Sequence, residues 1–178
     1  MATYIALLRA VNVGGRFVKM ADLRTGLSQA GFGEVESHIQ SGNLRLTSSL
    51  RSAAKVEVTL EKVLEELCGF TVRTIVRTPA QLGELTAYGE SLTISLEGDV
   101  RRYVTFLQQA PDADFVSAMN GWDIPGERAK VNGHEVYLWL ARPSHEAKLT
   151  NARIERGGGV ATSRDWKVVC ALAAKWGT

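Results

Sequence analysis

One cluster of polar and cationic residues is better suited to chemistry than any other part of this sequence. Its members lie in two short loops and are Arg9, Asn12, Gly14, Gly15, Arg16, Gln40, Ser41 and Asn43. Amide, hydroxyl and guanidinium groups hold carboxylates and phosphates, and glycine-rich loops add free main-chain N–H donors. The cluster therefore predicts a site for a small anionic or phosphate-bearing ligand. The alternative is that the glycines only form turns, while the amides cross-link the loops by hydrogen bonds.

The order of the predicted elements explains why the two loops should meet. Residues 4–8 form a nearly continuous apolar run, which is typical of a strand buried on both faces. A helix is expected from about Lys19, and alternating residues on both sides of Ser41-Gly42-Asn43 predict a hairpin. Because right-handed crossovers make the first two strands parallel, the loops that follow them emerge at the same end of the sheet.

The first 80 residues form one recognisable unit. An amphipathic helix is expected over 53–67 and is stopped by Gly69, and a strand follows over 71–77. The resulting order, βαββαβ, is that of a ferredoxin-like unit. We assign residues 1–80 to this unit and residues 81–100 to a connector that contains a short helix.

Residues 101–178 repeat this order in a less regular form. A short helix is expected over 112–119, and Asn132-Gly133 indicates a type I′ hairpin. The expected strands are 101–108, 124–131 and 135–141. The fold class is therefore α+β, with two ferredoxin-like units of the βαββαβ type. The second is less regular, with the order βαββα, and we expect the facing surfaces of the two units to form a cleft.

A second candidate site lies near the C-terminus. A helix over 145–156 should end before Gly157-Gly158-Gly159, and a final helix should begin at Arg164 with Thr162 or Ser163 as its cap. The candidate ligand-binding side chains are Lys148, Asn151, Arg153, Arg156 and Arg164. A mobile glycine-rich loop between these residues and the helix N–H groups would clamp a phosphate or carboxylate. The alternative is a flexible connector in which Arg164 serves the helix cap.

Several separated blocks of the sequence carry a resemblance to a known family. They are YIALLRAVNVGG, KMADLR, HIQSGN, AKLTNARIE and ATSRDW. In this order the blocks resemble the bacterial family catalogued as domain of unknown function 1697. The resemblance runs from about Thr3 to the C-terminal helix and implies a cytoplasmic α+β protein built on ferredoxin-like units, with no established activity. Two residues depart from the family's usual pattern: Ala10 replaces a glycine, and Asp165 replaces an asparagine and puts a negative charge beside Arg164.

Three aromatic residues support a competing hypothesis, association with nucleic acid. Tyr103, Tyr137 and Trp139 lie on the expected central strands of the second unit, close to where RNA-recognition folds place their base-stacking rings. The alternative is that these faces pack against the other unit. A third hypothesis is an enzyme of unknown class, which requires only that the cleft hold a reactive substrate. The sequence singles out no catalytic residue for it.

Composition and residue spacing argue against several classes of protein. The net charge is only +2, whereas nucleic-acid binders usually carry a strong basic surplus. The histidines and cysteines lack ligand spacing, so we expect neither a metal site nor a cofactor. No run approaches the roughly 20 apolar residues of a membrane span, and Met1 leads directly into a strand, so we expect a cytoplasmic protein. The sequence indicates no oligomeric state.

Overall fold

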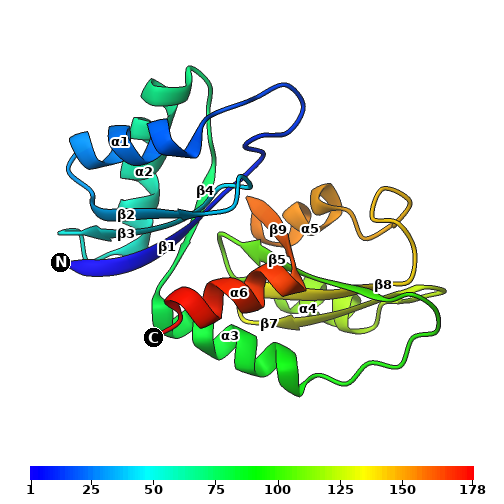
Figure 1. Cartoon of the computed structure of the whole chain (residues 1–178). Coiled ribbons are helices and arrows are strands. Elements are labelled where there is room, and N and C mark those ends of the chain that lie inside the picture. Colours follow the sequence, from blue (N-terminus) through cyan, green and yellow to red (C-terminus); the bar gives the residue numbers. More distant parts are fainter. The chain divides into compact units, whose positions relative to one another are not determined.

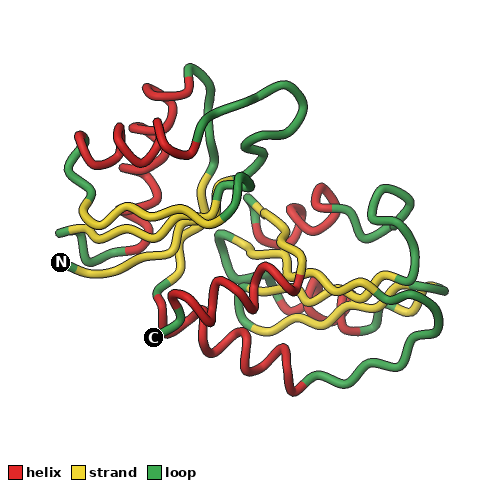
Figure 2. Tube along the Cα trace, in the orientation of Figure 1, coloured by secondary structure: helices red, strands yellow, loops and turns green.

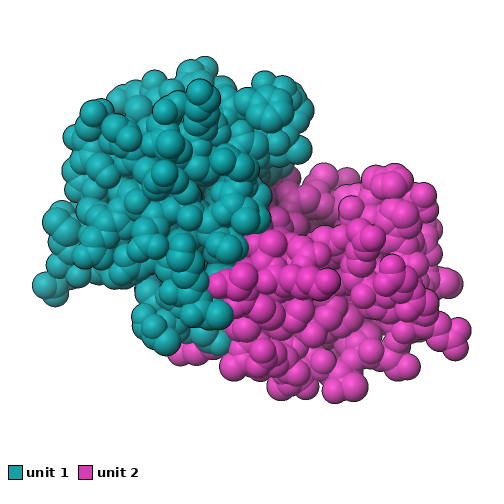
Figure 3. All heavy atoms as spheres, in the orientation of Figure 1, with its two compact units in different colours: residues 1–83, 172–178 teal, residues 84–171 magenta.

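The computed structural model describes residues 1–178 and contains six helices and two antiparallel sheets (Figures 1 and 2). Its contacts divide the chain into two compact units (Figure 3). Unit 1 comprises residues 1–83 and 172–178, and unit 2 comprises residues 84–171. The expected α+β class is confirmed. None of the helices combines the length and the apolar surface needed to cross a bilayer.

Unit 1 is built on a four-stranded sheet in the order β2-β3-β1-β4. Its strands are β1 (Ala2–Leu8), β2 (Gly33–His38), β3 (Asn43–Ser48) and β4 (Thr74–Arg77). A helix follows β1 and another follows β3, which gives the expected ferredoxin-like order. Residues 4–8 of the central strand β1 are all buried, in agreement with their unbroken apolar run.

Two helices cover one face of this sheet (Figure 1). Helix α1 (Met20–Gln29) contributes Leu23 and Leu27 to the core, and α2 (Ala53–Cys68) contributes Leu60 and Leu64. The side chain of Ser52 accepts a hydrogen bond at the start of α2, and Gly69 ends the helix in the left-handed conformation that its position predicts. The apolar faces that the sequence predicts for these two helices therefore form this core.

Unit 2 contains a five-stranded sheet in the order β6-β7-β8-β5-β9. Its strands are β5 (Arg101–Leu107), β6 (Asp123–Ile124), β7 (Glu127–Asn132), β8 (Glu135–Leu140) and β9 (Ala161–Asp165). Helices α4 (Ala113–Asn120) and α5 (Asn151–Gly158) pack through Met119 and Ile154 into one core with this sheet. Apart from the short edge strand β6, the element order and sheet order repeat those of unit 1.

Strand β9 corrects the expectation for the C-terminal region. Residues 161–165 pair with β5, from Leu107 opposite Ala161 to Tyr103 opposite Asp165. Helix α6 (Trp166–Trp176) therefore begins after Asp165, and Arg164 lies in a strand rather than at a helix start. Asp165, not Thr162 or Ser163, accepts a hydrogen bond from the first turn, at Lys167 N. The fourth strand completes the second ferredoxin-like unit.

Three other local predictions were wrong: the bounds of one helix, the continuity of one strand and the type of one turn. Helix α5 begins at Asn151 and includes Gly157 and Gly158, and both glycines pack too closely on neighbours to carry a side chain. The strand expected over 124–131 is divided by a turn in which Gly126 has φ 79°. Asn132 pairs with Glu135, so Gly133 and His134 form the hairpin turn, with positive φ at Gly133 alone, as in a type II′ rather than a type I′ turn.

Helix α3 (Pro79–Ser91) occupies most of the expected connector and is longer than the short helix predicted there. Thr78 begins it by exchanging two hydrogen bonds with Gln81, in which each main-chain N–H meets the other residue's side-chain oxygen. The division between the two units falls inside this helix, after Gly83. Its apolar residues Leu82 and Leu85 are both buried.

Candidate functional site

The two polar loops predicted to converge do so at one end of the sheet of unit 1. The side-chain amide of Asn12 donates a hydrogen bond to the main-chain oxygen of Gln40 at 2.6 Å. Its other atom, Oδ1, accepts a hydrogen bond from Val18 N at 2.8 Å. The nitrogen and the oxygen of the Asn12 amide therefore each join two segments of the site. This agrees with the alternative interpretation, in which the amides cross-link the loops by hydrogen bonds.

The first loop ends in a miniature hairpin. Arg16 N donates to the carbonyl oxygen of Val13 at 3.2 Å, and Asn12 N donates to the carbonyl oxygen of Arg16 at 2.8 Å. Gly14 and Gly15 have φ of 60° and 85°, the two positive values that a type I′ turn requires. The Arg16 guanidinium lies 5.2 Å from the centre of the Phe70 ring, a cation–π contact beside the core. This end of the loop is thus folded and anchored.

Left-handed backbone conformations gather at the same place. Ala10, Asn12 and Ile39 have φ of 55°, 60° and 50°, although none of them is glycine. Such conformations cost on the order of 1–3 kcal/mol each, and they persist where surrounding contacts enforce them, often at functional sites. A β-branched residue such as Ile39 is especially unusual in this region. The backbone of both loops is therefore strained in a way that favours a functional role.

A groove of about 890 Å³ lies between the loops. We call it the loop groove, and its lining residues are Val11, Asn12, Val13, Phe17, Val18, Lys19, Ile39, Gln40 and Ser41. Five of these nine side chains are apolar. Phe17 is 81% exposed, Val13 59% and Ile39 51%, which is unusual for large apolar residues that cluster on one surface. The site is therefore more apolar than its polar neighbours in the sequence indicated.

The electrostatic character of the loop groove is positive. Lys19 is its one charged lining residue and no aspartate or glutamate lines it, although Asp22 lies close by in the first turn of helix α1. Lys19 also occupies the N-cap position of α1, where no side chain accepts a hydrogen bond from the first turn. The Asp22 carboxylate offsets part of the positive charge of this helix N-terminus, so Lys19 is the main source of positive charge in the groove. The groove thus combines an apolar surface with a preference for negative charge.

Of the remaining predicted residues of this cluster, Asn43 and Arg9 lie outside the lining of the groove. Asn43 is fully buried, and its Nδ2 donates to the carbonyl oxygen of His38 at 3.2 Å and to Ser41 Oγ at 2.9 Å. Arg9 is half-buried and donates its main-chain N–H to the carbonyl oxygen of Arg73 at 2.8 Å. Gln40 and Ser41 do line the groove.

The five predicted ligand residues of the second candidate site all lie in unit 2, among them Lys148 and Arg164. Arg164 is 7% exposed and donates to Thr162 Oγ1 at 2.8 Å and to the carbonyl oxygen of Ser163 at 2.9 Å. Burial lowers the pKa of this guanidinium to about 10. Lys148 is exposed, and its main-chain N–H donates to the buried carboxylate of Glu127 at 2.8 Å. The two side chains therefore have different environments.

Two of the three glycines between them, Gly157 and Gly158, lie in helix α5 and not in the loop that the sequence suggested. A Cβ at Gly157 would collide with the Phe115 ring, and one at Gly158 would lie 2.7 Å from the carbonyl oxygen of Gln109. These glycines permit close packing of α5 within unit 2. Gly157 and Gly158 therefore belong to a packed helix, and the phosphate clamp stays a prediction.

The aromatic residues of unit 2 form no base-stacking platform. Tyr103 pairs with Leu138 and Tyr137 pairs with Val104, so the two tyrosine rings lie on opposite faces of the sheet. Tyr137 and Trp139 are 1% and 4% exposed, and the Tyr137 hydroxyl donates to the carbonyl oxygen of Leu85 at 2.7 Å. Burial raises the pKa of this phenol. These rings serve the interior of unit 2.

Sequence reasoning missed the apolar residues of the loop groove. Val13 and Phe17 lie in a loop and Ile39 follows the alternation of a strand, so neither pattern marks them as groove residues. A signal was present in VNVGGRFV, where large apolar side chains flank a glycine turn outside any regular period.

Comparison with known proteins adds a family and a fold. A family model described as "Protein of unknown function (DUF1697)" matches residues 1–137. The solved structure of the conserved bacterial protein SP0830 from Streptococcus pneumoniae is similar over 100% of this chain and 99% of that chain, with a TM-score of 0.75 and 23% sequence identity. At that identity the likeness establishes the fold alone. No match is found among curated proteins.

Proposed function

The chain belongs to the family of proteins of unknown function DUF1697, and we propose that it binds a small anionic ligand with an apolar body in the loop groove. The groove itself is the observation that supports this proposal. Its volume of about 890 Å³ falls within the ~300–1,000 Å³ that small-molecule sites occupy. Its lining joins a majority of apolar side chains to one cation and no carboxylate.

The lining residues predict a ligand with two chemically different parts. Its apolar body would cover Val13, Phe17 and Ile39, and burial of their exposed surface contributes roughly 25 cal/mol per Å². Its carboxylate or phosphate would lie near the Lys19 ammonium group, the one cation that lines the groove. This division favours an aromatic or aliphatic acid, or a phosphate ester of comparable shape, over a bare inorganic anion.

We also place this binding activity in the cytoplasm. Both cysteines, Cys68 and Cys170, are free, which is the usual state in a reducing compartment. Burial raises the pKa of both thiols, so neither has the character of a reactive thiolate.

Two matched dyes provide the test. Anilinonaphthalene sulfonate carries an aromatic body and a negative charge, whereas N-phenylnaphthylamine has a similar body without the charge. The folded protein should bind both with increased fluorescence, and the sulfonate should bind more tightly. Lys19→Gln should remove that difference, since it deletes the one cationic side chain of the groove.

Two further variants locate the dye. Phe17→Ser should weaken both dyes about tenfold or more, because a large apolar contact is lost. Val58→Ser changes a 70% exposed apolar residue on α2 and should bind like the wild type. Equal binding by Phe17→Ser and wild type would contradict the proposal. Competition by a single-stranded oligonucleotide that weakens steeply with salt would instead support the nucleic-acid hypothesis.

A further inference from the structure

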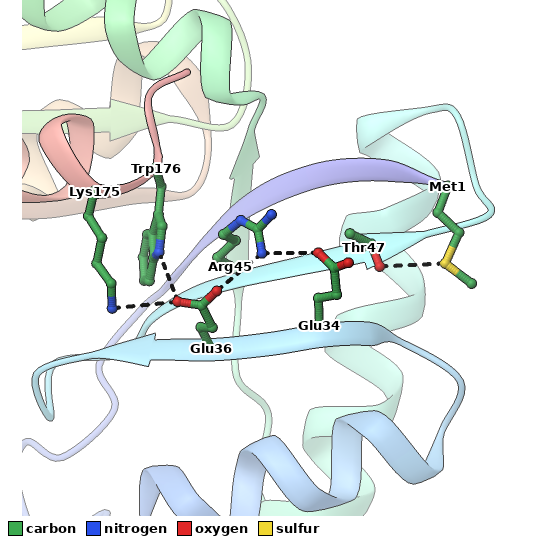
Figure 4. Close-up of polar contacts among 7 residues, drawn as sticks. All are labelled: Met1, Glu34, Glu36, Arg45, Thr47, Lys175 and Trp176. Carbon is green, nitrogen blue, oxygen red and sulfur yellow. Dashed lines mark hydrogen bonds and ion pairs between the residues drawn. The ribbon is translucent and has the colours of Figure 1, made fainter.

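The last turn of α6 packs against β2 within unit 1 (Figure 4). Trp176 is 4% exposed, and its indole N–H donates to Glu36 Oε2 at 3.3 Å. Its ring also meets His38 edge-on, with ring centroids 6.2 Å apart and planes inclined at 79°. A residue at the C-terminal end of the chain thus contacts two residues at the end of β2.

Glu36 lies at the centre of a small charged network (Figure 4). Lys175 Nζ is 3.6 Å from Glu36 Oε2, and Arg45 is 3.2 Å from Glu36 Oε1 and also from Glu34 Oε2. The side chains of Glu36 and Lys175 are each 46% exposed, so this ion pair is screened by solvent and contributes little. The buried Trp176 ring is therefore the stronger part of the contact.

The position of His38 connects this contact to the loop groove. His38 directly precedes Ile39, the groove residue with a φ of 50°. Two hydrogen bonds hold the turn that contains it, one from Asn43 to the carbonyl oxygen of His38 and one from Asn12 to that of Gln40. Trp176 adds a third contact, on the His38 ring itself. A strained residue needs such support, because relaxation of its backbone releases energy.

We infer that Trp176 is a positioning residue for the loop groove: by packing on His38, it keeps Ile39 in the conformation that forms the groove wall. This inference rests on the proposed function, since it concerns affinity at the same site. Thermodynamic coupling is reciprocal. A ligand in the groove must therefore stabilise the docked C-terminal segment, residues 172–178, by the same factor by which that segment strengthens ligand binding.

Dye titrations measure one direction of this coupling. Trp176→Ala should raise the Kd of anilinonaphthalene sulfonate about fivefold or more, the lower end of typical coupling between sites. Trp176→Phe keeps a ring against His38 but loses the N–H donated to Glu36, so it should retain most of the wild-type affinity. Lys175→Ala removes the exposed ion pair with Glu36 and the Lys175 cation on the Trp176 ring, 5.0 Å from its centre, but keeps the indole on His38, so it should bind like the wild type.

Hydrogen exchange in the wild-type protein measures the other direction and does not depend on whether a variant folds. Saturation with the dye should slow amide exchange in residues 172–178. Unchanged exchange there, with Trp176→Ala binding as tightly as wild type while Phe17→Ser does not, would overturn the inference and leave the proposed function intact. If Phe17→Ser itself binds normally, the proposed function fails and this inference fails with it.

Discussion

The side-chain amide of Asn12 and the main-chain oxygen of Gln40 are joined by a hydrogen bond of 2.6 Å between residues 28 positions apart. The bond crosses from the loop after β1 to the turn after β2, so it links the two walls of the loop groove. Because Asn12 Oδ1 also holds Val18 N, one side chain fixes three segments. Its role is to shape the groove in addition to lining it.

Asn12→Asp tests this role. The variant keeps an acceptor for Val18 N but cannot donate to Gln40, so a carboxylate faces a carbonyl oxygen. We expect a loss of about 1–3 kcal/mol in the free energy of unfolding and weaker binding of the anionic dye. Urea denaturation provides the measurement. Asn120→Asp is the matched control. The Oδ1 of Asn120 accepts a hydrogen bond from Val131 N, and an aspartate keeps that acceptor, so this variant should lose less stability than Asn12→Asp.

A comparison of two glycines tests how tightly the second loop is packed. Gly42 and Gly31 both have positive φ, of 75° and 97°, so alanine is strained at either position. A Cβ at Gly42 would also lie 2.8 Å from Leu8 Cβ, whereas one at Gly31 meets nothing within 4 Å. Gly42→Ala should therefore destabilise unit 1 by about 1–3 kcal/mol more than Gly31→Ala. Equal thermal shifts for the two variants would refute the close packing.

Tyr137 predicts a specific response to alkaline pH. Burial, aided by the charge of Glu135, raises the pKa of its phenol above the ordinary value of about 10. The unfolded chain therefore ionises first, so this residue's contribution to stability is intact below about pH 10 and is lost as pH rises further. The advantage of the wild type over Tyr137→Phe in urea should be constant from about pH 8 to about pH 9.5 and shrink by about pH 11. A difference that stays constant up to about pH 11 would show that the phenol is not buried.

Arg102 supplies a prediction for unit 2. Its guanidinium lies 4.3 Å from the Trp166 ring centre and 5.3 Å from that of Trp139, and it donates to the carbonyl oxygen of Gly89 at 2.7 Å. Arg102→Met keeps an apolar stem but removes these interactions, and it should cost about 1–3 kcal/mol of unfolding free energy. Arg101→Met, at the neighbouring exposed position, should change stability by less than about 0.5 kcal/mol. Similar losses in both variants would argue against the stacking.

Unit 1 was predictable because its local signals agree with its tertiary structure. The apolar run of β1, the glycine after α2 and the hairpin around Gly42 each specify one outcome. Strand β9 was different. Its residues ATSRD have the polar character of a helix cap, and only pairing with β5 makes them a strand. Pairing over a long sequence separation leaves no signal in the segment itself.

The candidate site was predictable only in its location. The right-handed crossover was enough to bring Asn12 and Gln40 to the same end of the sheet. The apolar lining depends on left-handed conformations at Ala10 and Ile39, residue types that rarely adopt them. Tertiary contacts such as that between Trp176 and His38 support these conformations, and no local pattern specifies them.

The most direct test of the central claim is an amide chemical-shift map of the isotope-labelled protein during titration with anilinonaphthalene sulfonate. Binding in the loop groove predicts the largest shifts in residues 11–19 and 39–41, and their loss in Phe17→Ser. Shifts confined to residues 84–171, or spread evenly over the chain, would contradict the assignment of the ligand site to this groove.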